Sequence, residues 1–464
     1  MTDKQMTKDY LLRSAPDASS DIESIGIFEL DYFGPSEVPS VFDILNGFLP
    51  VLVVAFFVTL VAVPIVRKIA TANDIIDHPD GDRKGHAYPV AYLGGVGVFI
   101  GVIAGIIASY IYVGNGIIID YPSVPIAVVL GMFAIVITGL FDDVWNWDPR
   151  LKIAGQLVAA AGLAVSDVGT LTAQGFLQWV FQPTASDVFL PFVPEMVQGW
   201  FTSSDGEVVG YFAPTFETMY YWAGVFLIAG LVLGACNAAN LIDGLDGLLA
   251  GTTSIMAIGF TAIAIMLAIH DAMLYYDGVN PSPFWDPLSG TRIVIALSLL
   301  GATLGFLPYN FNPAVIFLGD AGSMLIGFLF AVLIVSLGSE GNTEFVIAGL
   351  IVFALPIMDT VLAILRRKLA GLPMSAADRN HIHHMVLRAT GSVPKAVFAL
   401  YGMCASFVLL GVILVGMNMM GEIRNLAVYA VALVLFGFIA AVATKVALRH
   451  RWTIEAKAET TSAE

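Results

Sequence analysis

Long apolar runs recur along this chain and constrain its fold more than any other feature. Runs such as Ile44–Val66, Ala223–Cys236 and Leu426–Leu448 contain almost no charged residues. A helix needs about 20 apolar residues to cross about 30 Å of hydrocarbon. Only 12% of the residues are charged, against roughly 25% in soluble domains. The sequence therefore predicts an all-α fold, a polytopic transmembrane helical bundle.

Polar breaks divide the apolar sequence into about eleven spans. They are centred near residues 55, 103, 132, 158, 229, 258, 300, 331, 355, 406 and 437. Cytoplasmic loops carry an excess of Lys and Arg, and one set of alternate loops holds all but five of the 21 basic residues. The five exceptions are Lys4, Lys8, Arg13, Arg292 and Arg424. This distribution predicts an N-terminus outside and a cytoplasmic C-terminus.

Composition divides the chain into three parts. Residues 1–43 form an acidic polar tail, which we expect to be disordered and outside; it lacks the features of a signal peptide. Residues 44–450 form the transmembrane domain, with an external insertion at 167–218 and a cytoplasmic histidine-containing loop at 366–395. Residues 451–464 form a polar cytoplasmic tail. The net charge of −16 is interpreted as solvation of the tail and loops.

Five polar segments interrupt the apolar pattern, and each holds residues suited to phosphate or metal chemistry. The first runs from Asp77 to His86. Its basic side chains can hold phosphate oxygens through charge-assisted hydrogen bonds, and its glycines let the backbone approach a ligand. The alternative is that Arg83 and Lys84 only mark the membrane surface.

The second segment opens with two adjacent carboxylates directly after an apolar span. Asp142-Asp143 is followed by Arg150 and Lys152. Ionisable groups at the edge of the hydrocarbon are costly, which makes them candidates for a functional site, and hard cations prefer such oxygen ligands. The alternative is the solvated start of a loop.

The third and fourth segments add further carboxylates. The third reads Asn237-Ala-Ala-Asn240-Leu-Ile-Asp243-Gly-Leu-Asp246-Gly. If it is helical, residues spaced three apart converge on one face, and their oxygens suit a hydrated Mg²⁺ that carries a diphosphate. The fourth places Asp320 in a glycine-flanked turn, where it could cap the following helix, bind metal, or do both.

The fifth segment clusters three of the seven histidines within four residues, His381 to His384, beside Arg379. Among hard oxygen ligands, imidazoles are better suited to hydrogen-bond phosphate or sugar than to bind metal; the alternative is a polar surface loop. Under the predicted topology all five segments lie on the cytoplasmic face. Their carboxylates would repel each other, so a divalent cation and metal-dependent phosphoryl-group transfer are predicted there.

These five segments, in this order, resemble the polyprenyl-phosphate N-acetylhexosamine-1-phosphate transferases over about residues 44–450. The histidine loop resembles the WecA/TagO-like branch. The resemblance implies that undecaprenyl phosphate attacks the β-phosphorus of a UDP-N-acetylhexosamine, with UDP-N-acetylglucosamine favoured, and that UMP is released. It also implies a lipid-linked diphosphate sugar as product, the first membrane step of a cell-envelope polysaccharide, and a multi-pass protein of the bacterial cytoplasmic (inner) membrane.

The resemblance also assigns roles to the residues. It implies Mg²⁺ as cofactor, with Mn²⁺ as the alternative, and a homodimer is compatible with it; no nucleic-acid partner is expected. The metal site would comprise Asp143, Asp243 and Asp320. The residues expected to act in the reaction are Asp142, Asp143, Asp243, Asp246 and His383. The residues expected to bind substrate are Lys84, His86, Lys152, Asn237, Asn240, Arg379, His381 and His384.

Two other functions fit parts of the same pattern. A phospho-MurNAc-pentapeptide transferase of peptidoglycan synthesis belongs to the same superfamily, but that branch typically carries three consecutive histidines, whereas this chain has His381-Ile-His383-His384. An ion-coupled transporter is also polytopic with membrane carboxylates. Its acids, however, cluster near the bilayer midplane, and here they are expected at one membrane boundary.

Overall fold

The computed structural model describes residues 38–463 except for 78–88, 113–123, 146, 182–200, 203–207, 211–215, 279–285, 340, 370 and 372–380. Lys84, His86 and Arg379, three of the predicted substrate-binding residues, therefore lie outside the described residues. The predicted N-terminal tail lies almost entirely outside them as well.

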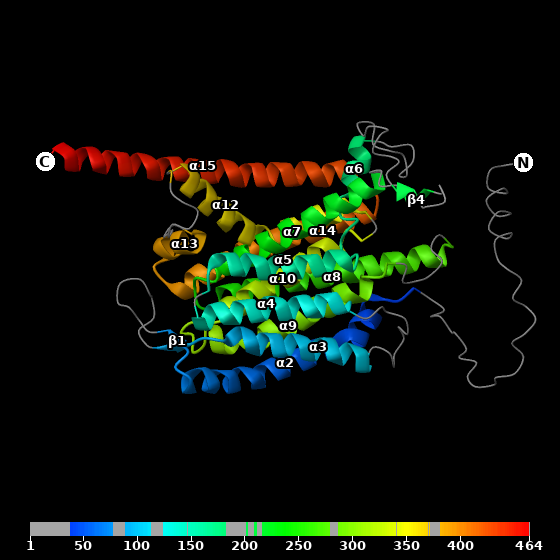
Figure 1. Cartoon of the computed structure of the whole chain (residues 1–464), viewed down its shortest axis with the longest axis horizontal. Coiled ribbons are helices and arrows are strands. Elements are labelled where there is room, and N and C mark those ends of the chain that lie inside the picture. The colour runs from blue at the N-terminus through cyan, green and yellow to red at the C-terminus, as the bar shows by residue number, and fades with distance from the viewer. Residues whose placement is uncertain are drawn as a thin grey trace, which may run out of the picture. The chain divides into compact units, whose positions relative to one another are not determined.

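Helices form nearly all of the described structure (Figure 1). They are α2 (Val41–Ala72), α3 (Gly94–Tyr112), α4 (Ile126–Trp145), α5 (Pro149–Val165), α6 (Gln174–Phe181), α7 (Phe216–Ile242), α8 (Leu248–Tyr276), α9 (Ser289–Asn310), α10 (Gly319–Ser336), α11 (Thr343–Val352), α12 (Ala354–Leu369), α13 (Ile382–Thr390), α14 (Val393–Met419) and α15 (Asn425–Ala463). Two short antiparallel pairs join β1 (Ile76–Asp77) to β2 (Val90–Ala91), and β3 (Phe201–Thr202) to β4 (Val208–Gly210). The prediction of an all-α fold is confirmed.

Nine of the described helices are long and apolar enough to cross a membrane. Helices α11 and α12 together qualify as a tenth span, bent by 76° at the break between them. The remaining predicted span, centred near residue 158, coincides with α5. Its 17 residues extend only about 25 Å at 1.5 Å per residue. The prediction of a polytopic bundle is therefore confirmed, with nine or ten spans by length and composition.

Helices α9 and α10 are the most enclosed of the nine candidate membrane spans among the described helices. In each, 89% of the most apolar stretch is buried, as expected for helices that are hydrophobic on all sides. Small residues allow close approach to α10. A Cβ atom on Gly95 would lie 2.1 Å from the backbone N of Gly322, and one on Gly139 would lie 2.4 Å from Cα of Ala321. The first turn of α10 is thus held closely by α3 and α4.

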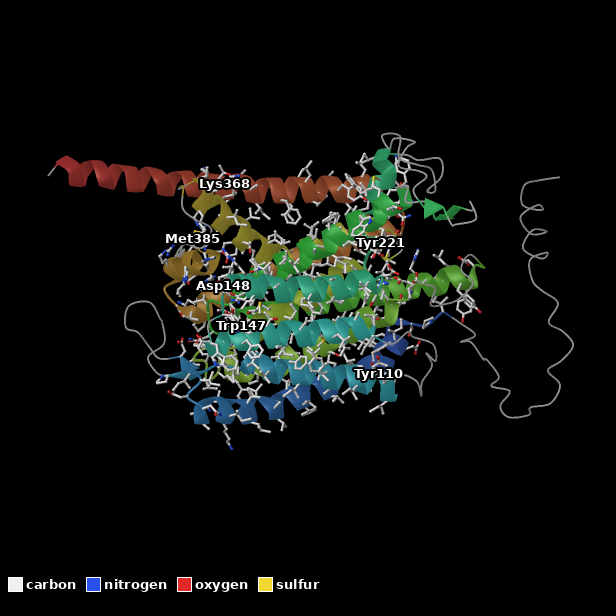
Figure 2. All side chains as sticks on the ribbon, in the orientation of Figure 1. Tyr110, Trp147, Asp148, Tyr221, Lys368 and Met385 are labelled. Atoms are coloured by element: carbon white, nitrogen blue, oxygen red, sulfur yellow. The ribbon has the colours of Figure 1, made fainter. Side chains whose placement is uncertain are left out.

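Several segments that are distant in sequence end at one end of the bundle, on the left of Figure 1. Strand β2 continues into a parallel bridge between Ala91 and Ile316, and the amides of Gly94 and Gly95 donate to the carbonyls of Phe317 and Leu318 at 2.9 and 2.8 Å. Figure 2 shows the α4–α5 connection, α12 and α13 at this same end, marked by Asp148, Lys368 and Met385, with Tyr110 and Tyr221 toward the other end. The candidate site lies among these segment ends.

Candidate functional site

The Asp142-Asp143 pair lies in the last turn of α4, and Asp143 binds the start of α10. Its two carboxylate oxygens accept hydrogen bonds from the backbone N–H groups of Asp320 (2.7 Å) and Ala321 (3.1 Å). The first amides of a helix have no partner within the helix and carry a partial positive charge, so a carboxylate stabilises them. Sequence reasoning allowed Asp320 to cap this helix; the structure gives that role to Asp143.

A glycine makes this capping contact possible. Gly319 has a φ angle of +74°, in the left-handed region that favours glycine. A Cβ atom there would come within 2.6 Å of an Asp143 carboxylate oxygen. Glycine at position 319 therefore meets two requirements, the left-handed backbone angle and the close approach of the Asp143 carboxylate.

Lys152 connects three of the converging helices. Its ammonium group, on α5, donates to Asp142 of α4 at 2.9 Å and also to the carboxylate of Asp320 on α10. These side chains are 16–25% exposed, so the ion pairs lie at a partly accessible surface. The structure thus brings together Asp142, Lys152 and Asp320, which are far apart in sequence.

The two asparagines of the third polar segment lie on α7 and face the same network. Asn240 donates to Asp320 at 2.7 Å and to the Ser323 hydroxyl at 3.2 Å. Asn237 donates to the side-chain oxygen of Gln156 at 3.0 Å. Gln156 is fully buried, so polar contacts extend from the site into the bundle between α5, α7 and α10.

The two aspartates that follow do not continue along the helix. Helix α7 ends at Ile242, so the interpretation of this segment as one helical face is wrong beyond Asn240. Asp246 instead accepts hydrogen bonds from the Asn312 side chain (2.9 Å) and the Ala314 amide (3.0 Å). Asp246 thus stabilises the turn between α9 and α10. Its expected role in the reaction stays a prediction.

Asp243 occupies the loop directly after α7, and its carboxylate makes no hydrogen bond to the described residues. Burial raises the pKa of this carboxyl group to about 7, and the negative charges of Asp320, Asp143 and Asp246 contribute to the shift. The carboxylates are therefore close enough to repel each other. Asp243 is the member of the cluster best able to accept a cation.

The described histidines of this loop, His381 to His384 at the start of α13, dock onto the Asp243 turn. The ring of His383 lies against Gly244, where a Cβ atom would come within 2.2 Å of Nε2. The rings of His383 and His384 lie with their centroids 4.3 Å apart, and those of His381 and His383 5.4 Å apart. Burial lowers the pKa of His383 to about 4, so this imidazole is neutral at neutral pH.

Sequence reasoning missed one residue of this region. Asp359, on α12, is fully buried and binds the start of the histidine loop at His381 and Ile382. The signal was present in the sequence, because Asp359 is a single carboxylate within an apolar run, and such residues are expensive in a membrane. It was overlooked because it lies outside the five polar segments.

The described residues fit the predicted Mg²⁺ in their chemistry. They contain no group of three His, Cys, Asp or Glu side chains arranged to hold a metal ion. Mg²⁺, however, is commonly bound by one or two carboxylates together with substrate phosphates and water. Asp243 offers a carboxylate without a hydrogen-bond partner among the described residues, and Asp320 lies in the same repelling cluster. These donors suit a divalent cation that reaches the protein together with a diphosphate.

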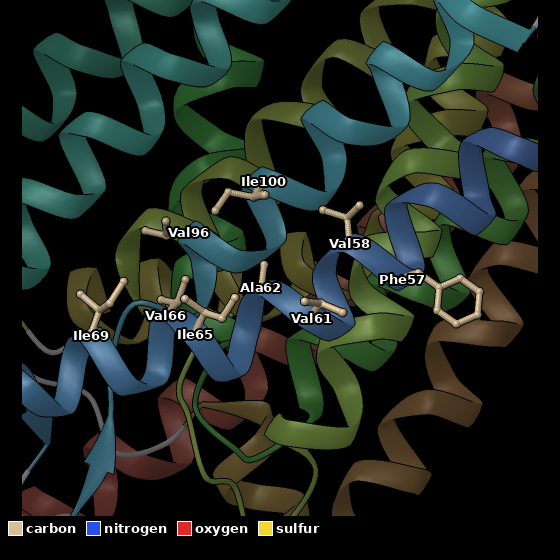
Figure 3. A pocket seen from close by; sticks show the side chains of 9 residues that line it. All are labelled: Phe57, Val58, Val61, Ala62, Ile65, Val66, Ile69, Val96 and Ile100. Atoms are coloured by element: carbon tan, nitrogen blue, oxygen red, sulfur yellow. The ribbon is translucent and has the colours of Figure 1, made fainter.

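An apolar groove lies between α2 and α3 (Figure 3). It has a volume of about 640 Å³. Its lining residues are Phe57, Val58, Val61, Ala62, Ile65, Val66, Ile69, Val96 and Ile100. None of them can bind phosphate or metal, so the groove is excluded as the site of phosphoryl chemistry.

Comparison with known protein sequences places this chain in a family. A model of glycosyl transferase family 4 matches residues 125–338, which include Asp142, Lys152, Asp243 and Asp320. The probable undecaprenyl-phosphate N-acetylglucosaminyl 1-phosphate transferase of Bacillus subtilis is 33% identical over 359 residues, covering 75% of this chain and 81% of that protein.

Two further relatives match over similar lengths. The decaprenyl-phosphate N-acetylglucosaminephosphotransferase of Mycolicibacterium smegmatis is 31% identical, covering 75% of this chain and 77% of that protein. The undecaprenyl-phosphate alpha-N-acetylglucosaminyl 1-phosphate transferase of Escherichia coli K12 is 28% identical, covering 85% and 92%. The resemblance predicted from the five motifs is confirmed, and the chain belongs to glycosyl transferase family 4.

Proposed function

We propose that this protein transfers N-acetylglucosamine 1-phosphate from UDP-N-acetylglucosamine to undecaprenyl phosphate. The observation that carries the proposal is the network of Asp142, Lys152, Asn240 and Asp320 next to Asp243, at one end of a membrane bundle. Carboxylates that can receive a cation, beside an ammonium and amides, suit a diphosphate substrate. The relatives described above carry names for the same transfer to a polyprenyl phosphate.

In the proposed reaction, an oxygen of the lipid phosphate forms a bond to the β-phosphorus of the UDP-sugar. The bond from that phosphorus to the oxygen bridging the two phosphates breaks, and UMP leaves with this oxygen. The second pKa of a phosphate monoester is about 6, so the attacking oxygen is already ionised at neutral pH. The reaction therefore needs positioning and charge neutralisation more than a general base.

The residues divide these tasks. When bound, Mg²⁺ would neutralise charge on the diphosphate, and Asp243 and Asp320 would hold it. Asp143 was also expected in the metal site, but both of its oxygens accept hydrogen bonds from amides of α10. Lys152 keeps Asp142 and Asp320 together, and Asp143 fixes the first turn of α10. The predicted contacts of Lys84, His86, Arg379, His381 and His384 with the anion and sugar complete the proposal.

The site would lie on the cytoplasmic face of the bacterial inner membrane. The end of the bundle that carries the carboxylates also carries basic residues, near the end of one helix and in the last turn of another. They are Arg67 and Lys68 of α2, and Arg366, Arg367 and Lys368 of α12. Because positive charge marks the cytoplasmic side, the nucleotide sugar and the lipid phosphate would meet there.

The test is an assay of the purified full-length protein with UDP-N-acetylglucosamine, undecaprenyl phosphate and Mg²⁺. We expect UMP and a lipid-linked diphosphate sugar in equal amounts, and we expect the Asp243→Asn variant to lose this activity. Failure to release UMP from any UDP-hexosamine would overturn the proposal. A preference for UDP-MurNAc-pentapeptide would move the protein to the other branch of the superfamily.

A further inference from the structure

Asp359 is a carboxylate enclosed within the protein, with both oxygens in use. It lies on α12 and is 0% exposed. One oxygen is 2.9 Å from Nδ1 of His381, and the other accepts a hydrogen bond from the backbone N–H of Ile382 at 2.7 Å. Burying a carboxylate is costly unless strong partners compensate. Both partners here belong to the histidine loop.

His383 is held from two sides in the same place. It is 2% exposed, and its Nδ1 lies 3.8 Å from the Asp359 carboxylate. This nitrogen has no hydrogen-bond partner among the described residues. On its other side, the ring lies against Gly244, next to Asp243. His381 and His383, at the start of α13, are therefore enclosed between α12 and the turn that carries the candidate cation-binding carboxylate.

We propose that Asp359 is a positioning residue for the histidine loop. A carboxylate accepts hydrogen bonds, so it selects the His381 tautomer that carries its proton on Nδ1 and leaves Nε2 as the free end of the ring. The same carboxylate fixes the plane of that ring and keeps His383 against the Asp243–Gly244 turn. This inference rests on the proposed function, since the loop is expected to contact the phosphates or sugar.

A purely structural role is the alternative, because Asp359 also caps α13 through the Ile382 amide. The Asp359→Asn substitution separates the two roles. The Asn side-chain oxygen can still accept from the Ile382 amide, so the cap is kept. Its NH₂ group, facing His381, can only donate a hydrogen bond. Nδ1 of His381 must then accept that bond, so the ring carries its proton on Nε2 instead.

The first experiment compares the kinetics and thermal stability of full-length variants. Asp359→Asn should lower kcat at least tenfold, leave the KM for the lipid phosphate within twofold, and change the Tm little. Asp271→Asn is the matched control, because Asp271 is also a buried carboxylate, 6% exposed. It lies away from the site and accepts a hydrogen bond of 3.1 Å from the Ser289 hydroxyl. The control should keep its kcat. Equal losses of kcat in both variants would overturn the proposal.

A double-mutant cycle with His381→Ala tests whether Asp359 acts through that histidine. In the His381→Ala background, Asp359→Asn should change kcat by less than twofold. An undiminished tenfold loss in that background would show that the carboxylate acts independently of His381. That result would overturn the positioning role.

A measurement on the unmodified protein keeps the inference testable even if the variant fails to fold. Nitrogen NMR of ¹⁵N-histidine-labelled protein, with His381 assigned by comparison with His381→Gln, should show the Nδ1–H tautomer. The Nε2–H tautomer would overturn the proposal. This readout does not depend on activity. A protein that shows the Nδ1–H tautomer but releases no UMP would leave the positioning intact and refute the proposed reaction.

Discussion

At the scale of single residues, the described part of the candidate site has an excess of negative charge. The ammonium group of Lys152 contacts two of its carboxylates, those of Asp142 and Asp320. Burial raises the pKa of Asp243, and the negative charges of Asp320 and Asp143 contribute to the shift. Carboxylates this close together are stable only if hydrogen-bond donors, protons or cations compensate their charge. Each prediction at this scale removes or adds one such charge.

Lys152→Met should reduce the transfer reaction roughly 10- to 100-fold. A hydrogen bond to a charged group contributes about 1.5–3 kcal/mol, and each 1.36 kcal/mol is a factor of about ten in rate. Initial rates of UMP release measure the effect, and Lys152→Arg should retain part of the activity. The control is Lys395→Met, which removes an exposed lysine of α14. If both Met variants keep full activity, the bridging role of Lys152 is wrong.

Stability in the absence of metal should depend on the ionisation of Asp243. Its pKa is about 7 in the folded chain and 3.8 ordinarily, so the folded state binds more protons between these values. Stability should therefore fall as the pH rises from about 4 to about 7 and then level off, as far as this group is concerned. Thermal unfolding with EDTA would show the fall.

Two controls attribute this pH dependence to Asp243. Asp243→Asn should flatten the part of the curve that this group contributes. Mg²⁺ added to the wild type at about pH 8 should raise the Tm, because a cation that binds the ionised carboxylate stabilises the folded state. A curve of unchanged slope in Asp243→Asn would refute the assignment.

At the scale of secondary-structure elements, the site is built from the ends of helices. The last turns of α4 and α7 meet the first turns of α5 and α10, and α13 docks on the loop after α7. Helix ends expose unpaired amides and carbonyls, so they hold polar side chains and ligands at a membrane boundary. The histidine loop and the start of α10 are the two elements whose placement can be tested separately.

Asp143→Ala should destabilise the protein by about 1 kcal/mol, the usual effect of losing a helix cap, and Asp143→Asn should do so less. Because both oxygens of Asp143 bind amides of α10, Asp143→Asn should leave the Mg²⁺ concentration for half-maximal activity nearly unchanged. Asp243→Asn should raise it strongly or abolish activity. Equal shifts of the Mg²⁺ requirement would mean that Asp143 binds the cation as directly as Asp243.

Gly244→Ala should displace the histidine loop and lower activity at least tenfold. The new methyl group would come within 2.2 Å of His383 Nε2, and this ring is buried and cannot move aside without disturbing the loop. Gly234→Ala on α7 is the control, because its Cβ atom would meet nothing within 4 Å. Activity of both variants, with their Tm values, gives the comparison. A fully active Gly244→Ala would show that the contact is not needed.

At the scale of the whole molecule, the distribution of charge predicts orientation. A cysteine at Lys68, at the end of α2 near the site, should be protected from an impermeant maleimide in intact cells. A cysteine at Ser166, after the far end of α5, should react. Both positions are exposed, and the native Cys236 and Cys404 are each 0% exposed, so background labelling should be low. Reversed labelling would place the site outside and contradict the proposed substrate access.

The sequence by itself determined the membrane fold and most of the chemistry of the site. Repeated apolar runs predict membrane-spanning helices, because a helix satisfies its backbone hydrogen bonds internally when it lies in lipid. Carboxylates and histidines at the ends of those runs were visible for the same reason, because they are costly there. Asp142, Asp143, Asp243, Asp320 and the histidine loop could therefore be named without coordinates.

The tertiary structure decided which of these groups neutralise each other. It showed Asp143 on the amides of α10, Asp246 on the turn near Asn312, and Asp243 without a hydrogen bond to a described residue. It also revealed Asp359 beneath His381. The physical reason is that a carboxylate's role depends on its partners in space, and these partners lie up to 178 residues away in sequence. Local sequence patterns specify the helices, but only the packing of those helices determines which charged groups form pairs.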